Sequence, residues 1–331
     1  MRSERLVIWA ARLAVGLALL FYSEVVWWAS DPLALDALAW ATRLVLYTLT
    51  AALMLDLMGR FEVGELFGWL VIGGLYGLIN GALITGSAFD DLPISLITRP
   101  LGLHTLGGGM LALAWLFWLL DGRGITPLRL IVVAGAGLLQ GVWVQTYPLL
   151  PTNRMAVPAL GQVAAVTAVG LILVPGMLWL VVRALRRTTE QPLGPALQLN
   201  RIEWGLVGGG LAGLFAARFQ ADALGTFAGV VLGGLVGYLV LLLFLLRGQA
   251  RQPVLERLSP VKVPKVGVLA VFAVVHLLAL VAGYSLIRDD AAAGMFRVLT
   301  AGLTVFGLVW LPGVSVGLGL RSYIRLFRQQ G

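Results

Sequence analysis

Apolar stretches long enough to cross a lipid bilayer follow one another along almost the whole chain. A membrane-spanning helix needs roughly 20 mainly apolar residues in a row. Hydrophobic residues make up 59% of the 331 residues and charged residues 12%, whereas soluble domains contain about 25% charged residues. A soluble fold of this size could not bury so much apolar surface. The sequence therefore predicts an all-α polytopic membrane protein.

We predict about ten transmembrane helices that form a single domain over residues 1–331. They cover approximately residues 6–30, 36–58, 63–88, 101–120, 128–147, 157–182, 202–217, 223–246, 266–287 and 295–318. Two polar, proline-containing segments, residues 183–201 and 247–265, are predicted to be cytoplasmic linkers. The first stretch is longer than the apolar part of a signal peptide, so we expect a retained helix.

Basic residues gather on one side of every predicted hairpin. Arg123, Arg183 and Arg247 follow the return helices, whereas Asp91 and Asp290 lie at the opposite ends. Loops that carry Lys and Arg stay in the cytoplasm. We therefore expect both termini to be cytoplasmic, in a membrane of the prokaryotic cytoplasmic type.

The net charge of +8 follows from the same distribution. Basic residues spread over several short loops can contact anionic lipid headgroups, and no basic domain with interleaved aromatic residues suggests a nucleic-acid partner. The expected partners are membrane lipids, including anionic headgroups at the cytoplasmic loops, together with other membrane proteins.

A glycine pattern recurs along the chain and predicts an internal repeat. Gly77, Gly137 and Gly213 lie in the outward helices of successive hairpins, and each is followed by leucine. Small residues on one helix face allow neighbouring helices to approach closely. We interpret the pattern as tandem helical hairpins that all point the same way, unlike the inverted halves of many transporters.

Glu24 and Arg43 are charged residues inside the first two predicted helices. Counted at about 1.5 Å per residue, both lie roughly 10 Å below the outer surface and can pair. Charges inside a membrane are costly and often functional. Two interpretations stay open: a structural ion pair, or a substrate or proton site.

Other polar residues lie on the small-residue faces of the predicted helices. Asn80, Gln140 and Gln145 can hydrogen-bond to a neighbouring helix or bind a substrate. His104 and His276 are isolated, which favours hydrogen bonds within the bundle over a metal or haem site. The full set of candidate substrate-lining or ion-lining residues is Glu24, Arg43, Asn80, His104, Gln140, Gln145, Arg218 and His276.

The sequence contains no recognisable catalytic, nucleotide-binding or zinc-protease motif, and it contains no cysteine. The acidic pairs Asp90–Asp91 and Asp289–Asp290 lack a second acidic cluster that would help them hold Mg²⁺. We interpret both pairs as residues of turns that end helices. We predict no catalytic residue, no metal site and no cofactor.

Repeats, glycine faces and polar residues in the outer half of the membrane favour a transporter, permease or flippase-like protein with an outward-facing polar cavity. A noncatalytic structural subunit of a larger membrane complex is the first alternative, because glycine faces and abundant tryptophan would suffice for it. A lipid-handling membrane enzyme with a site at the outer interface is the second.

Overall fold

The fold is known from a computed structural model, which describes residues 2–29, 31–89, 91–121, 124–146, 157–188, 192–221, 225–250, 252–258, 262–286 and 289–330. Within these ranges all regular structure is helical, and no strand is present. Asp90, Arg123 and the predicted turn around Pro151 lie outside the described residues.

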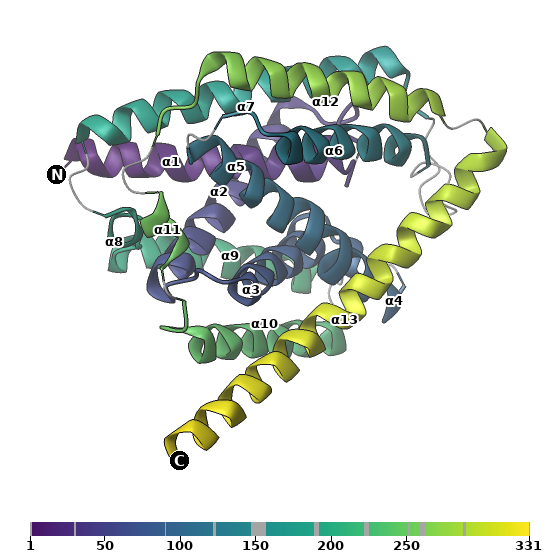
Figure 1. Cartoon of the computed structure of the whole chain (residues 1–331). Coiled ribbons are helices and arrows are strands. Elements are labelled where there is room, and N and C mark those ends of the chain that lie inside the picture. The colour runs from purple at the N-terminus through teal and green to yellow at the C-terminus, as the bar shows by residue number, and fades with distance from the viewer. Residues whose placement is uncertain are drawn as a thin grey trace. The chain divides into compact units, whose positions relative to one another are not determined.

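The longer helices follow the predicted apolar stretches closely (Figure 1). They are α1 (Arg2–Leu20), α2 (Ala37–Arg60), α3 (Leu66–Leu78), α5 (Ala112–Leu120), α6 (Pro127–Thr146), α7 (Leu160–Thr188), α9 (Arg201–Gln220), α10 (Thr226–Leu246), α12 (Val266–Leu286) and α13 (Asp289–Gln330). Short helices are η3 (Ser87–Phe89), α4 (Ile94–Leu96), α8 (Leu193–Ala196) and α11 (Val254–Arg257), of which α8 and α11 lie in the predicted linkers.

Nine helical segments in the described part of the chain are long and apolar enough to cross a membrane. They are Glu4–Val26, Ala37–Arg60, Leu66–Ile84, Ile94–Leu120, Pro127–Thr146, Leu160–Thr188, Thr226–Leu246, Val266–Leu286 and Arg297–Arg321. The protein is therefore an all-helical protein of the membrane-embedded type. The predicted seventh span is an unbroken helix, α9, but it is not among the nine, and it contains Arg201, Glu203 and Arg218. The count of ten, the hairpin arrangement and the cytoplasmic termini stay predictions.

Three segments of the described chain are π-helical, which the sequence did not predict. They are η1 (Phe21–Val26), η2 (Ile79–Ile84) and η4 (Ile97–Leu111). Each contains one of the polar candidate residues, namely Glu24, Asn80 and His104. A π-helix bonds each amide to the fifth residue before it and often occurs at functional sites.

The ends of the chain's long helices also differ from the prediction. The first span ends its regular structure at Val26 rather than near residue 30, because η1 closes there. The last helix begins at Asp289 and continues to Gln330, beyond the predicted residues 295–318. Asp289 and Asp290 therefore start a helix instead of ending one.

The chain divides into two compact units. The first comprises residues Met1–Ala51, Leu111–Gln191 and Pro260–Ala301, and the second comprises Ala52–Met110, Pro192–Ser259 and Gly302–Gly331. The predicted single domain is not tested by this division and stays a prediction. Each unit is described by itself.

In the first unit, α12 lies along both α6 and α7, and α7 also lies along α1 (Figure 1). Glycine makes the α6–α12 contact close. A Cβ atom on Gly137 or Gly141 would collide with the backbone carbonyls of His276 or Leu280, and one on Gly283 with that of Leu138. These residues must be small for the two helices to pack at this distance.

In the second unit, α10 lies along α3, and η2 packs against η4. A Cβ atom on Gly77 would collide with the carbonyl of Pro100, and one on Gly81 would meet the Pro100 ring at 2.6 Å. A Cβ atom on Gly213, in contrast, would meet no neighbouring residue within 4 Å. Gly77, Gly137 and Gly213 therefore have three different surroundings, and the internal repeat stays a prediction.

Candidate functional site

The π-helix η1 organises the polar interior of the first unit. All six of its residues are buried. Its helical hydrogen bonding ends where the Trp27 N–H donates to the Tyr22 carbonyl over 3.0 Å, and Trp28 follows with a φ of 47°. The last carbonyls of a helix have no partner within the helix. In a membrane interior other groups must satisfy them, because water is absent.

Glu24 of η1 is fully buried and bonds to two side chains of α2. Arg43 Nη1 donates to Glu24 Oε2 over 2.5 Å, and the Tyr47 hydroxyl donates to Glu24 Oε1 over 2.6 Å. Arg43 and Tyr47 are one helical turn apart, so both reach the same carboxylate. The predicted ion pair is confirmed. The Arg43 side chain is 20% exposed whereas that of Glu24 is 0% exposed, so the arginine connects the buried carboxylate to the surface of the unit.

Gln140 of α6 links three neighbouring elements. Its Nε2 donates to the Val25 carbonyl of η1 over 3.0 Å and to Thr167 Oγ1 of α7 over 2.8 Å. Its Oε1 lies 2.8 Å from Nε2 of His276 in α12. A carbonyl oxygen can only accept, and the Val25 carbonyl fixes which end of the amide carries hydrogen. The His276 Nε2 therefore carries a proton and donates to Gln140.

Two further side chains of α6 bond to backbone carbonyls of its neighbours. The Trp143 indole N–H donates to the carbonyl of Trp27, just after η1. The Gln145 amide donates to the carbonyl of Tyr284 in α12. The prediction that Gln140 and Gln145 bond across to other helices is confirmed. With Gln140, Trp143 supplies donors to the carbonyls at the end of the first span.

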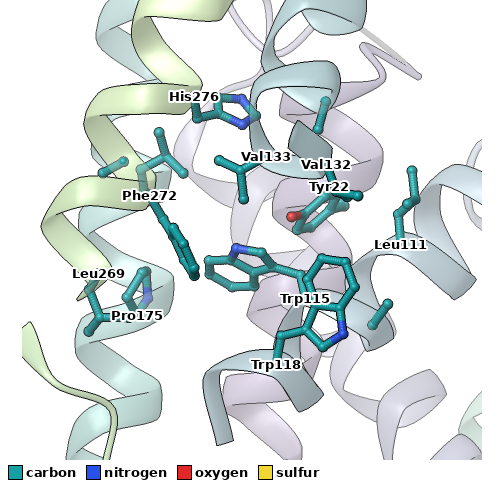
Figure 2. Close-up of a pocket in the computed structure, with 14 residues that line it drawn as sticks. Tyr22, Leu111, Trp115, Trp118, Val132, Val133, Pro175, Leu269, Phe272 and His276 are labelled. Carbon is teal, nitrogen blue, oxygen red and sulfur yellow. The ribbon is translucent and has the colours of Figure 1, made fainter. Parts of the chain in front are cut away.

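An aromatic cavity lies beside this network, with walls from η1, α5, α6, α7 and α12 (Figure 2). The rings of Tyr22 and Trp115, with centroids 5.8 Å apart, line it next to each other, and Phe272 and His276 also line it. Its volume is about 20 Å³, which suffices for about one water molecule. Tyr22 lies two residues before Glu24, so η1 contributes to the cavity and to the ion pair.

The second unit contains the other three candidates. The Asn80 amide donates to the Tyr76 hydroxyl, four residues earlier in the chain, over 2.8 Å. His104 Nε2 lies 3.4 Å from Ser87 Oγ. Arg218 of α9 donates to the carbonyls of Leu83 and Ile84 over 2.9 and 2.8 Å, so it satisfies the last carbonyls of η2.

The structure thus brings together Glu24 with Arg43, and Gln140 with His276, while Asn80, His104 and Arg218 belong to the second unit. The aromatic cavity is lined mainly by apolar side chains and is not the outward-facing polar cavity that the sequence suggested. Among the described residues, no group of three or more acidic or histidine side chains could hold a metal ion.

Tyr22, Trp115, Thr167 and Arg12 are not among the candidate functional residues that the sequence predicted. Thr167 could have been found, because it is a polar residue in the middle of an apolar stretch. Arg12 is fully buried, with its guanidinium 4.6 Å from the Trp9 ring centroid. Nothing in the sequence distinguishes Tyr22 and Trp115 from the other aromatic residues of the spans.

Comparison with known proteins finds no similarity: no family model matches the chain, and neither a curated protein nor a solved structure matches it significantly. What the protein does must therefore be inferred from its own side chains.

Proposed function

We propose that this protein is a membrane transporter in which Glu24, Arg43 and Tyr47 form the centre that binds a substrate or a coupling ion. The observation that carries the proposal is the fully buried Glu24 carboxylate, held at 2.5 Å by a partly exposed arginine of a neighbouring helix. Ionisable residues within membrane spans mark substrate and ion pathways in many membrane proteins.

Packing alone does not require an ion pair between these two helices. Burying two charges costs several kcal/mol of solvation, about as much as their attraction returns, so apolar residues would serve packing equally well. Glu24 instead carries a charge-assisted bond from Arg43 and a bond from the Tyr47 hydroxyl. A negatively charged substrate can compete with Glu24 for Arg43, and a proton or cation can compete with Arg43 for Glu24.

The backbone around Glu24 supports the same proposal. A π turn holds about one residue more than an α turn, so a shift of η1 towards α geometry would re-aim the side chains inside it. Because Glu24 lies inside η1, such a shift would move the carboxylate relative to Arg43. That movement gives a transporter a means of opening and closing the pair.

The test uses the absence of cysteine, which leaves no background for thiol labelling. Thr50 lies on the same side of α2 as Arg43 and Tyr47, is fully buried, and donates its hydroxyl to the Leu46 carbonyl. In a transporter that alternates between two open states, Thr50→Cys should react with a membrane-impermeant thiol reagent from each side of sealed vesicles. Labelling is read by mass shift on gels.

Thr146→Cys is the matched control. Thr146 is also fully buried and also donates to carbonyls of its own helix, but that helix is α6 rather than α2. It should react from one side at most. Protection of Thr50→Cys from both sides would favour the structural-subunit alternative and contradict the transporter proposal.

A further inference from the structure

An apolar groove runs along the first unit between α7 and the pair α1–α2. It is lined by residues of all three helices and has a volume of about 580 Å³. The lining residues are Leu13, Leu17, Leu44, Ile172, Leu173, Gly176, Met177, Trp179 and Leu180. The size lies within the usual range of ligand sites, roughly 300–1,000 Å³.

Several of these side chains are unusually exposed for large apolar residues. Ile172, Leu173 and Leu180 are 70%, 54% and 59% exposed. A Cβ atom on Gly176, which lies between them, would meet no neighbouring residue within 4 Å. The groove thus exists because a glycine leaves the middle of the α7 surface without a side chain.

Arginine residues of α7 lie at one end of the groove. Gly176, Leu180, Arg183 and Arg187 follow one another at spacings of four, three and four residues on α7. Such spacings place them in one row along the helix. The exposed Arg183 guanidinium lies over the ring of the groove residue Trp179, 5.3 Å from its centroid. Tryptophan prefers the boundary between acyl chains and headgroups, so this end of the groove has the properties of a membrane–water interface.

We propose that the groove binds one phospholipid with an anionic headgroup. An acyl chain occupies the apolar part beside Gly176, and the phosphate meets Arg183 and Arg187. Arginine suits this role because its planar guanidinium can give two parallel hydrogen bonds to phosphate oxygens. Charge complementarity identifies the occupant, since an apolar helix of a partner protein would not need basic residues at the end of its path.

Most of the charged side chains that α7 and α1 bring to this end of the groove are basic. Arg186 and Arg187 form the last turn of α7. α1 runs antiparallel to α7, because Phe21 meets Gly170 while Leu13 shares the groove with Leu180. Its first turn therefore comes to the same end and brings Glu4 as the acidic residue of that turn. The described basic side chains still outnumber Glu4, which favours an anionic headgroup over a neutral one.

The experiment is native mass spectrometry of the full-length protein in detergent, titrated with phosphatidylglycerol or with phosphatidylcholine of the same acyl chains. Phosphatidylglycerol should bind more tightly. Arg183→Gln and Arg187→Gln should each weaken it by about fivefold while phosphatidylcholine binding stays unchanged. Equal binding of the two lipids by the wild-type protein would overturn the headgroup assignment.

A second pair of variants tests the groove itself. Gly176→Leu fills it with a side chain that meets open space, and should weaken the binding of both lipids by about tenfold. Gly161→Leu, on the same helix and also without neighbours within 4 Å, should leave binding unchanged. Ile172→Trp covers the groove from an exposed position and should act like Gly176→Leu. If both groove variants bind the lipids as the wild-type protein does, the groove is not a lipid site. The same conclusion follows if the variants lose a protein dimer instead of a lipid adduct.

Discussion

The side-chain amide of Gln140 donates a hydrogen bond to the backbone carbonyl of Val25, 3.0 Å away. The carbonyl belongs to the last turn of a π-helix, and the amide belongs to a helix more than a hundred residues later in the chain. The same amide group also bonds to Thr167 and His276. One side chain therefore ties η1, α6, α7 and α12 into a single buried network.

Gln140→Leu should destabilise the protein by about 2–3 kcal/mol, because the Val25 carbonyl and the His276 N–H would then be buried without partners. Thermal unfolding in detergent, followed by intrinsic tryptophan fluorescence, measures the change. Gln220→Leu, at an exposed position on α9, should change the midpoint little. The double variant Gln140→Leu/His276→Leu should lose clearly less free energy of unfolding than the two single variants lose together, since the two residues share a bond. Additive effects would argue against the network.

Glu24 and Arg43 should be energetically coupled. Removing one partner of a buried ion pair leaves the other charge buried alone and costs about 3 kcal/mol or more, with a smaller loss here because Arg43 is partly exposed. Glu24→Gln and Arg43→Gln should each lower the unfolding midpoint, and the double variant should recover much of the loss. A double-mutant cycle on thermal stability measures the coupling.

Glu256→Gln is the control for that cycle, because Glu256 is an exposed carboxylate of α11. Its replacement should leave stability unchanged and show no coupling to Arg43→Gln. If the effects of Glu24→Gln and Arg43→Gln simply add, the two side chains do not depend on each other, and the proposed binding centre loses its basis.

Two glycines of α6 should respond in opposite ways to alanine. Gly137→Ala forces a methyl group against the His276 carbonyl and should cost about 1–3 kcal/mol through separation of α6 from α12. Gly135→Ala, two residues earlier with no neighbour within 4 Å, should be neutral or stabilise by about 0.5–1 kcal/mol through helix propensity. The measurement is the unfolding midpoint of the two variants in one detergent. Equal effects would mean that α6 and α12 do not pack through Gly137.

The membrane orientation can be tested by labelling single cysteines introduced at exposed positions. Ala34 lies in the segment between η1 and α2, and Glu256 lies on α11 within the polar segment 247–265. Positive-inside topology places Glu256→Cys in the cytoplasm and Ala34→Cys on the opposite side. An impermeant thiol reagent added to intact cells should therefore label Ala34→Cys alone. Labelling of Glu256→Cys from outside would reject the predicted topology.

Composition and apolar run length predicted the helices well, because a chain in lipid has few ways to satisfy its backbone other than helix formation. Counting residues along two adjacent helices also predicted that Glu24 and Arg43 meet, since both depth and sequence proximity are readable from the chain. That Gln140 and Gln145 bond to neighbouring helices followed from the cost of burying an amide without a partner, although the partner of each bond did not.

Other features have no local signature. The bond between Gln140 and Val25 depends on how α6 packs against η1, and a sequence does not display contacts over such a separation. The three π-helical segments resemble ordinary apolar helix in composition. The glycine pattern does not reveal which glycines lie in helix contacts, because Gly77 and Gly137 pack against backbone whereas Gly213 faces open space.

Because η1 is a π-helix, the deletion of a single residue within it would change the direction of the Glu24 side chain. A π turn holds about one residue more than an α turn, so a single deletion that converts η1 to α geometry leaves the side chains beyond it nearly unchanged in direction and re-aims those inside it. Deleting Ser23 would therefore keep the helix, its composition and its hydropathy nearly intact, yet turn Glu24 away from Arg43 and Tyr47. Whether the first two helices pair through this carboxylate therefore depends on the register of the turn as well as on the presence of Glu24 in it.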